Sequence, residues 1–213
     1  MNMYLQTIPR AIELHKSGKQ LAQWPIVGVE KLRANRVNWP TKILNGGGEL
    51  LKINGVTAAQ ADVEISFEVN NNIEEAEVLD NWTDPEILCS ESSSIKSGLG
   101  PFGLLVFASK GLKEFTSVFF RIFKYQQKPL VLFCSDQSRS SLKNNDMSTY
   151  GTFIDVDVLH EKLSLRSLID HSVVESFGGE GRASIRPSLP EFIPHWPSMM
   201  KHYFMLSIME LLM

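Results

Sequence analysis

The chain of 213 residues contains only two cysteines, Cys89 and Cys134, and five scattered histidines. These residues do not supply the four clustered ligands of a structural zinc site, so we expect no metal. For the cysteine pair, the residues alone leave free thiols and one disulfide both open. No apolar run reaches the ~18 residues of a membrane span, and residues 1–11 lack the apolar stretch of a signal peptide. We therefore expect no signal peptide on this chain and no membrane partner.

Excess charge of either sign is also missing. The formal net charge is −3, which gives no electrostatic reason to expect nucleic acid as a partner. The charges are nevertheless unevenly distributed: residues 53–95 hold ten acidic and no basic side chains, and residues 96–145 hold eight basic side chains against Glu114 and Asp136. We interpret these segments as solvated surfaces of opposite charge that complement each other.

Long amphipathic helical patterns are absent, and the middle of the chain alternates instead. From Ala61 to Val69, apolar residues alternate with polar ones, the period of a strand with one solvated face. Turn signals rich in Gly, Asn and Pro separate the further short runs that we predict as strands. These runs cover residues 102–108, 117–125, 130–134, 154–158, 163–169 and 172–177. Many short strands without long helices between them predict an all-β fold, an antiparallel β-sandwich.

The two ends of the chain differ from this middle. Near the N-terminus, residues 17–19 (SGK) predict a hairpin turn. From Pro187 onward, the tail holds four of the ten prolines and five of the eight methionines. Residues 198–213 are apolar enough for a helix but too short to span a bilayer. We interpret the tail as foreign to the sandwich.

Two glycine-rich segments have the composition of phosphate-binding loops. Residues 98–103 match G-x-G-x-x-G, but the dinucleotide-binding version needs a helix after the motif, and here a strand is predicted. Residues 178–181 (GGEG) could hold an anion through backbone N–H groups, but they lie between two predicted strands. We interpret the first segment as a turn and the second as a hairpin loop, and we predict no cofactor.

Two other groups have the residue types of hydrolytic sites. Asp170, His171 and Ser172 are the types found in a catalytic triad, but adjacent side chains on a strand point to opposite faces. His171 would therefore point away from its neighbours. Asp155 and Asp157 would share one open strand face, where similar solvation would not separate their pKa values as a glycosidase requires. We predict no catalytic residue in either group.

Aromatic residues raise hypotheses about binding. Arg121 and Lys124 stand among phenylalanines, and without an excess of positive charge we interpret them as solubilising residues beside core aromatics rather than as a base-stacking surface. Trp39 and Trp82 are the candidate platforms for a sugar, although packing or loop positions explain both more simply. Residues 81–83 (NWT) form a glycosylation sequon, which makes Asn81 a candidate site if the chain is secreted.

Several segments resemble the C-terminal region of glycoside hydrolase family 32, and within that family the plant acid invertases (β-fructofuranosidases) and fructan exohydrolases. The similarity covers roughly residues 5–187, and several long motifs in the right order make it specific. These motifs are residues 166–179 (RSLIDHSVVESFGG), 133–140 (FCSDQSRS), 98–109 (GLGPFGLLVFAS), 56–67 (VTAAQADVEISF) and 17–25 (SGKQLAQWP).

The resemblance implies a domain organisation. Members of the family have a five-bladed β-propeller followed by a β-sandwich. By this similarity, residues 1–30 are a remnant of the last propeller blade, 31–45 a linker, 46–187 an incomplete sandwich, and 188–213 an atypical tail in place of the closing strands. The resemblance also implies a disulfide between Cys89 and Cys134.

The function that the resemblance implies is partial. Family members release terminal fructose from sucrose or fructans, in the cell wall or the vacuole, with catalytic carboxylates in W-M-N-D-P-N-G, R-D-P and E-C motifs of the propeller. None of these motifs is present, and residues 82–85 (WTDP) echo the first without its Asn-Gly. We expect an inactive structural sandwich whose partner is the parent propeller domain. The alternative is a non-catalytic sandwich that binds sucrose or fructan, or docks on a partner protein.

Overall fold

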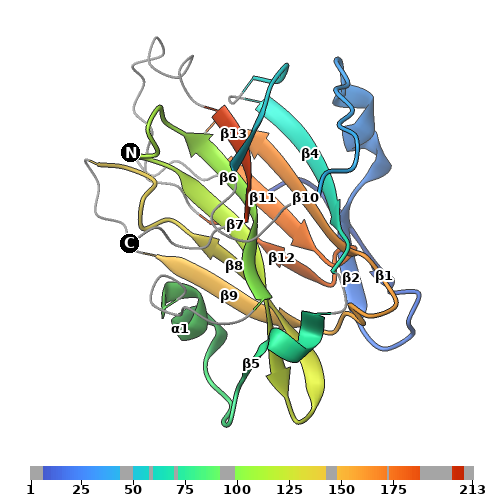
Figure 1. Cartoon of the computed structure of the whole chain (residues 1–213). Coiled ribbons are helices and arrows are strands. Elements are labelled where there is room, and N and C mark those ends of the chain that lie inside the picture. Colours follow the sequence, from blue (N-terminus) through green and yellow to red (C-terminus); the bar gives the residue numbers. More distant parts are fainter. Residues whose placement is uncertain are drawn as a thin grey trace, which may run out of the picture.

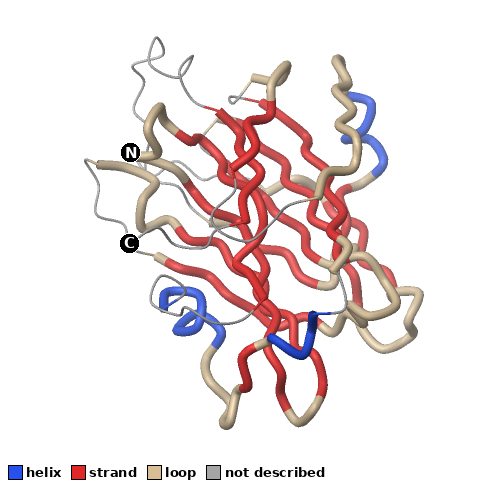
Figure 2. The backbone as a smooth tube through the Cα atoms, in the orientation of Figure 1, coloured by secondary structure: helices blue, strands red, loops and turns tan. Residues whose placement is uncertain are grey.

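The computed structural model describes residues 7–43, 50–57, 60–69, 72–91, 99–142, 148–171, 173–187 and 203–208. Strands are the main regular structure of this part of the chain, and the helices are short (Figure 2). Two sheets pack face to face, with a hairpin at one side and the helix α1 at the other (Figure 1). The predicted all-β sandwich is therefore confirmed.

The smaller sheet has four strands in the order β12-β11-β10-β4, and every neighbouring pair is antiparallel. The alternation read from the sequence positions these strands, since apolar residues at every second position turn toward the core. Their bounds are Gln60–Phe67 for β4, Leu163–Asp170 for β10, Val173–Gly178 for β11 and Ala183–Ile185 for β12.

The larger sheet has the order β3-β13-β6-β7-β8-β9, and these neighbours are antiparallel. A two-residue strand, β5 (Glu77–Val78), pairs with β7 in parallel. The other bounds are Leu50–Ile53 for β3, Leu99–Ala108 for β6, Thr116–Tyr125 for β7, Lys128–Asp136 for β8, Thr149–Ile154 for β9 and Tyr203–Ile208 for β13.

The tail corrects one sequence-based expectation. Tyr203–Ile208 is a strand, not a helix, and it lies between β3 and β6 in the larger sheet. The residues 203–208 therefore belong to the sandwich, and the interpretation of the whole tail as foreign to it was wrong. A short apolar run satisfies either assignment by composition, and only the backbone groups offered by β3 and β6 decide for a strand. The rest of residues 188–213 lies outside the described residues.

The glycine motif at residues 98–103 also differs from its interpretation as a turn. Its described part, residues 99–103, forms the first half of β6, and the pairing with β7 shifts register between Leu99 and Phe102. Gly103 lies where a Cβ atom would overlap the Val118 carbonyl, so only glycine permits this approach of the two strands. A strand follows the motif, as predicted, and the dinucleotide-binding arrangement is not formed.

The main core lies between the two sheets. It contains Phe102, Phe120 and Phe133 from the larger sheet, and Leu165 and Val174 from the smaller. Phe120 and Phe133 are fully buried and stack with their ring centroids 4.9 Å apart. The alternate positions of both sheets point outward and carry different residue types, and this difference defines the two outer faces.

The outer face of the larger sheet is apolar and is covered by α1 (Pro85–Ser90). The Asp84 carboxylate accepts a hydrogen bond from the Glu86 N–H at 2.8 Å and so caps the helix. Cys89 of α1 and Cys134 of β8 form a disulfide with Cα atoms 5.7 Å apart. Gly151 of β9 permits this contact, because a Cβ atom there would meet the Cys89 Sγ and the Pro85 carbonyl, each at 2.6 Å.

The N-terminal part of the chain covers the outer face of the smaller sheet. It begins with the hairpin of β1 (Arg10–Leu14) and β2 (Leu21–Pro25), whose turn includes the predicted residues 17–19. A 3-10 helix, η1 (Val27–Leu32), follows. A second one, η2 (Asn72–Glu75), precedes β5. In Figure 1 the hairpin lies on the side of the sandwich opposite α1.

Candidate functional site

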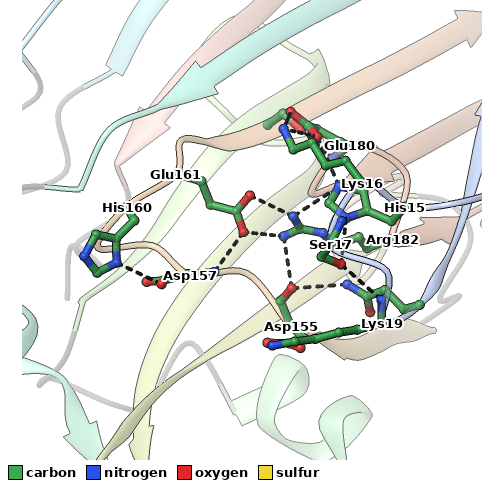
Figure 3. Close-up of polar contacts among 12 residues, drawn as sticks. His15, Lys16, Ser17, Lys19, Asp155, Asp157, His160, Glu161, Glu180 and Arg182 are labelled. Carbon is green, nitrogen blue, oxygen red and sulfur yellow. Dashed lines mark hydrogen bonds and ion pairs between the residues drawn. The ribbon is translucent and has the colours of Figure 1, made fainter.

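Charged side chains gather where the turn of the hairpin meets the sandwich (Figure 3). At the centre is Arg182, which lies between β11 and β12 and whose side chain is 2% exposed. It donates two hydrogen bonds to the Glu161 carboxylate, from Nη1 at 2.8 Å and from Nη2 at 2.7 Å. It also donates to the Asp155 carbonyl at 3.0 Å. The forked guanidinium thus ties β12 to the segment that connects β9 and β10.

His15 connects the hairpin to this arginine. The buried imidazole places its Nε2 atom 3.2 Å from the Arg182 guanidinium and 3.1 Å from the Glu180 carboxylate. The Ser17 N–H donates to Nδ1 at 3.1 Å, which fixes the imidazole against the turn of the hairpin. Lys16 donates to the same carboxylate at 2.9 Å. We call His15, Lys16, Glu161, Glu180 and Arg182 the turn network.

The two carboxylates of the turn network stay ionised. The hydrogen bonds from Arg182 lower the pKa of Glu161 below its ordinary value, and burial opposes them only in part. The hydrogen bond from Lys16 lowers the pKa of Glu180 in the same way. Glycosidic hydrolysis requires one carboxyl that holds a proton near neutral pH. The turn network holds two ionised carboxylates between cationic side chains, an arrangement that supports attachment of the hairpin.

A second set of contacts lies on the outer face of the smaller sheet. Arg166 of β10 is 1% exposed and donates to the Asp62 carboxylate from Nε at 3.0 Å and from Nη2 at 2.8 Å. Its guanidinium lies 5.3 Å from the ring centroid of Trp24 on the hairpin. Arg33, from beyond η1, binds Asp62 and Glu64. Asp62 therefore binds one arginine from the sheet, Arg166, and one from the N-terminal segment, Arg33.

A parallel arrangement occupies the neighbouring strand. Glu175 of β11 is 1% exposed and accepts hydrogen bonds from the Ile8 N–H at 3.1 Å and from Arg10 at 3.4 Å. The Arg10 guanidinium also lies 5.2 Å from the Phe177 ring, which meets Trp24 edge-to-face at 5.8 Å. We call the contacts of Arg166 and Glu175 with the N-terminal segment, together with the turn network, the hairpin joint.

The hairpin joint was missed in the sequence, although a signal for it exists. Arg166 and Glu175 interrupt strands that are otherwise apolar or small, in the runs LSLRSLI and VVESF. A charge in such a run must find a partner, since burying it alone is costly. Their partners lie more than 100 residues away along the chain: Asp62 and Trp24 for Arg166, and Arg10 for Glu175. Periodicity could indicate that partners were needed, but it could not say which residues they are.

The structure also places the carboxylates considered for catalysis. Asp155 and Asp157 are exposed, as predicted, but they follow the end of β9 and do not belong to a strand. Asp157 binds His160 at 2.8 Å and accepts from the Leu159 N–H, which closes a turn. Both residues connect β9 to β10.

The expected orientation of His171 was wrong. β10 ends at Asp170, and His171 has a left-handed backbone with φ 53°. The chain turns at this residue, so the imidazole comes back to the Asp170 carboxylate at 2.6 Å. The alternation rule failed because it holds only inside a strand. Ser172 lies outside the described residues, and the His171–Asp170 pair is exposed to solvent.

Residues 178–181 form the hairpin loop that was predicted, between β11 and β12. Its backbone N–H groups bind the protein itself. The Gly179 N–H donates to the Ser164 carbonyl, and the Glu180 N–H to the Ser164 hydroxyl. The Gly181 carbonyl accepts from the Gln23 N–H at 2.8 Å. These donors are occupied, and the loop serves to receive the hairpin.

Arg121 and Lys124 of β7 lie apart from the hairpin joint. Lys124 binds Glu74 at 2.6 Å, as opposite charges on complementary surfaces should. Arg121 does not fit its interpretation as a solubilising residue, because its side chain is 2% exposed and its nearest acidic partner is Glu77 at 3.5 Å. Burial lowers the pKa of Arg121 below its ordinary value. The guanidinium lies 4.9 Å from the Phe123 ring, which explains its place on an apolar face.

The tryptophans considered as sugar platforms have different environments. Trp39 is 40% exposed in the segment after η1. Trp82 is 63% exposed, and its ring meets Phe153 at 4.8 Å and Tyr125 at 6.1 Å between centroids. Asn81, beside it, is exposed in the loop between β5 and α1. Trp82 thus packs against aromatic side chains of β7 and β9.

The described residues also bear on metal binding and on membrane crossing. Within the described ranges, no three His, Cys, Asp or Glu side chains are placed to hold a metal ion. In those ranges, no helix has the length and hydropathy to cross a membrane.

Comparison with known proteins gives one consistent family. The family model "Glycosyl hydrolases family 32 C terminal" matches residues 28–186. A pea protein named "Beta-fructofuranosidase, cell wall isozyme" is 63% identical over 200 residues, which are 92% of this chain and 36% of the pea protein. A fructan 6-exohydrolase of Beta vulgaris is 53% identical over 185 residues, which are 85% of this chain and 30% of that protein.

A solved structure supports the same assignment. The crystal structure of fructan 1-exohydrolase IIa from Cichorium intybus superposes with a TM-score of 0.85 at 45% identity, and the match covers 94% of this chain and 37% of that one. The chain thus spans about a third of the length of these relatives. The resemblance described from the sequence motifs is confirmed.

Proposed function

The chain belongs to the C-terminal domain family of glycosyl hydrolases family 32, and we propose that it is the structural β-sandwich of a secreted fructosidase. The complete enzyme would release terminal fructose from sucrose or a fructan. Its catalytic carboxylates would come from a propeller domain, while the sandwich would hold that domain in place. The names of the pea and beet relatives support this reaction class, and the name of the pea protein supports a cell-wall location.

The observation that carries the proposal is the hairpin joint. Ionic contacts join residues 7–33 to residues more than 100 positions later: Arg10 to Glu175, Lys16 to Glu180, and Glu30 to Arg166 at 3.8 Å. Interfaces between domains of one chain are more polar than domain cores, and the hairpin joint has that character. Buried ion pairs also fix one orientation, because a displaced partner would leave a charge without compensation. A joint of this kind suits a domain that must keep a fixed relation to its catalytic neighbour.

Exposed apolar side chains of the hairpin support the same proposal. Ile12, Leu14 and Leu21 of the two strands are 65%, 64% and 61% exposed. Isolated two-stranded hairpins are marginal in water, and clustered apolar side chains usually meet another surface. We assign these side chains to the contact with the rest of the propeller blade.

A chimeric enzyme tests this proposal. The segment of the pea protein that aligns with this chain would be replaced by this chain, and the secreted chimera assayed on sucrose and on a fructan. We expect hydrolysis by the chimera and none by this chain alone. A chimera that is secreted and folded but inactive would contradict the proposal. Retention of the chain alone on a fructan matrix, lost on Trp82→Ala, would favour the sugar-binding alternative instead.

A further inference from the structure

We propose that Asn81 carries an N-linked glycan and that the first sugar of this glycan packs against the exposed ring of Trp82. The inference rests on the secretory route included in the proposed function, but not on the hydrolytic reaction. Asn81 is the asparagine of the only N-x-Ser/Thr sequence in the 213 residues. The site lies near α1, on the side of the molecule away from the hairpin joint (Figure 1).

The backbone around Asn81 suits modification. The residue is exposed in the irregular loop between β5 and α1, and in the described part of the chain no hydrogen bond engages its side-chain amide. The Thr83 hydroxyl donates to the Asn81 carbonyl at 3.5 Å, so the loop is already turned with the hydroxyl toward the asparagine. The capped start of α1 at Asp84 keeps the next residues in place. An acceptor segment with these properties is accessible without unfolding the sandwich.

Trp82 gives the glycan a surface. Its indole is 63% exposed, yet Phe153 and Tyr125 hold it against the sheet at 4.8 Å and 6.1 Å between centroids. Val78 and Ile87, on the same segment, are 60% and 50% exposed. A pyranose ring has one face of C–H groups, which an aromatic ring shields from water while the hydroxyls stay solvated. A sugar on Asn81 would cover apolar surface that is otherwise in contact with water.

The covalent step uses a lipid-linked oligosaccharide of the secretory pathway. The Asn81 amide nitrogen attacks C1 of the first sugar, and a C–N bond forms as the C1–O bond to the lipid diphosphate breaks. The amide loses one proton, and the lipid diphosphate is the leaving group. No oxidant or reductant takes part, and the side chain remains an amide that carries a bulky, polar substituent.

The modification is tested on the whole chain secreted from plant or insect cells behind an added leader. We expect one glycan, seen as a mass increase that peptide:N-glycosidase removes while it converts Asn81 to Asp. Thr83→Ala should abolish the increase. Thr83→Ser, which also loses the methyl group but keeps the hydroxyl, should retain it. An unmodified Asn81 in the secreted, folded chain would overturn the proposal. This measurement does not depend on hydrolysis of sucrose or a fructan. An unmodified Asn81 and an inactive chimeric enzyme are therefore distinguishable outcomes.

The packing on Trp82 is tested by collisional quenching of tryptophan fluorescence with acrylamide. We expect weaker quenching in the glycosylated protein than after enzymatic removal of the glycan from the same folded protein. In a Trp82→Phe variant, which keeps a ring and the sequon, this difference should disappear. Equal quenching before and after removal, with the glycan present, would overturn the packing. Self-association that appears only in the deglycosylated protein would support it, since the uncovered ring is then free to make contacts.

Discussion

The outer faces of the two sheets are both covered, but by different chemistry. On the larger sheet, Phe119, Leu132 and the Cys89–Cys134 disulfide form an apolar cluster under α1. On the smaller sheet, Arg166 and Glu175 are equally buried. Asp62 of β4 compensates the charge of Arg166, and Arg10 of the N-terminal segment compensates that of Glu175. The first cover comes from segments that border the sheet in sequence, while the second comes from the far end of the chain. An apolar cluster stabilises one domain, whereas a charged face specifies how a second structural unit must be placed.

Of the changes considered for the two faces, loss of the disulfide should lower the free energy of unfolding most. The bond closes a loop with a sequence separation of 45 residues, and the chain-entropy relation gives it about 4 kcal/mol of unfolding free energy. We expect the double variant Cys89→Ala, Cys134→Ala to lose that amount in denaturant titrations, with the whole sandwich destabilised. Reduction of the wild-type protein by dithiothreitol is the matched control. A change below about 1 kcal/mol would show that the apolar cluster holds α1 without the bond.

Removal of the buried arginine should have the next largest effect. Arg166→Met leaves the Asp62 carboxylate with Arg33 as its remaining partner, and breaking a buried ion pair from one side costs about 3 kcal/mol. Arg36→Met makes the same exchange at an exposed position and should stay within about 0.5 kcal/mol. Chemical denaturation measures both. Equal losses would mean that the buried charge has no special role in the hairpin joint.

Two glycines with a left-handed backbone, Gly18 and Gly181, allow the cost of backbone strain to be measured separately from the cost of a lost contact. Gly181 has φ 83°, and a Cβ atom there would overlap the Gln23 carbonyl on the hairpin. Gly18 has φ 70°, and a Cβ atom there would meet nothing within 4 Å. We expect Gly18→Ala to cost about 1 kcal/mol from the left-handed backbone alone. Gly181→Ala should cost about 2 kcal/mol, because it also breaks the bond from the Gln23 N–H to the Gly181 carbonyl.

The readout for this pair is the rate of tryptic cleavage after Lys16 and Lys19, which are exposed in the hairpin turn. Gly181→Ala should raise this rate more than Gly18→Ala does, since only the former loosens the hairpin from the sandwich. If Gly18→Ala had the larger effect, the contact with the Gln23 carbonyl would not hold the hairpin.

Local rules predicted the parts of this fold that depend on neighbours in sequence. Alternation located β4 to within a few residues, because a strand with one buried face imposes a period of two, and short apolar runs between turn signals located β7 and β10. It missed β3 and β12, which are too short for a period to show. The strand β13 was missed for another reason, since its composition allows a helix and its place depends on β3 and β6.

The hairpin joint shows the same limit at the level of single residues. The charge of Arg166 within an apolar run indicates a partner, and nothing in the run selects Asp62 and Trp24. Only the register of β4 with β10 and the fold of the hairpin bring them together. The sequon at Asn81 could be identified directly from the sequence. The aromatic contacts of Trp82 could not, because they come from β7 and β9.

The smallest expected effect is a difference between the two outer faces in how their stability depends on pH. The pKa values of Glu161 and Glu180 are lowered in the folded protein by hydrogen bonds from Arg182 and Lys16, relative to an ordinary value of 4.5. A lowered pKa means that the stabilisation is complete above that ordinary value and is lost as the pH falls through the folded-state pKa. The apolar cluster under α1 contains no group that titrates in this range.

Acid should therefore loosen the hairpin before it affects α1. We expect amide hydrogen exchange in residues 10–25 to gain in rate relative to residues 85–90 as the pH falls below about 4.5, after correction for the intrinsic rates. The variant Arg182→Gln, which removes the main donor to Glu161, should lose the part of this dependence that Glu161 contributes. If exchange in both segments rose in parallel, the turn network would not be the acid-sensitive part of the hairpin joint, and the two faces would open as one cooperative unit.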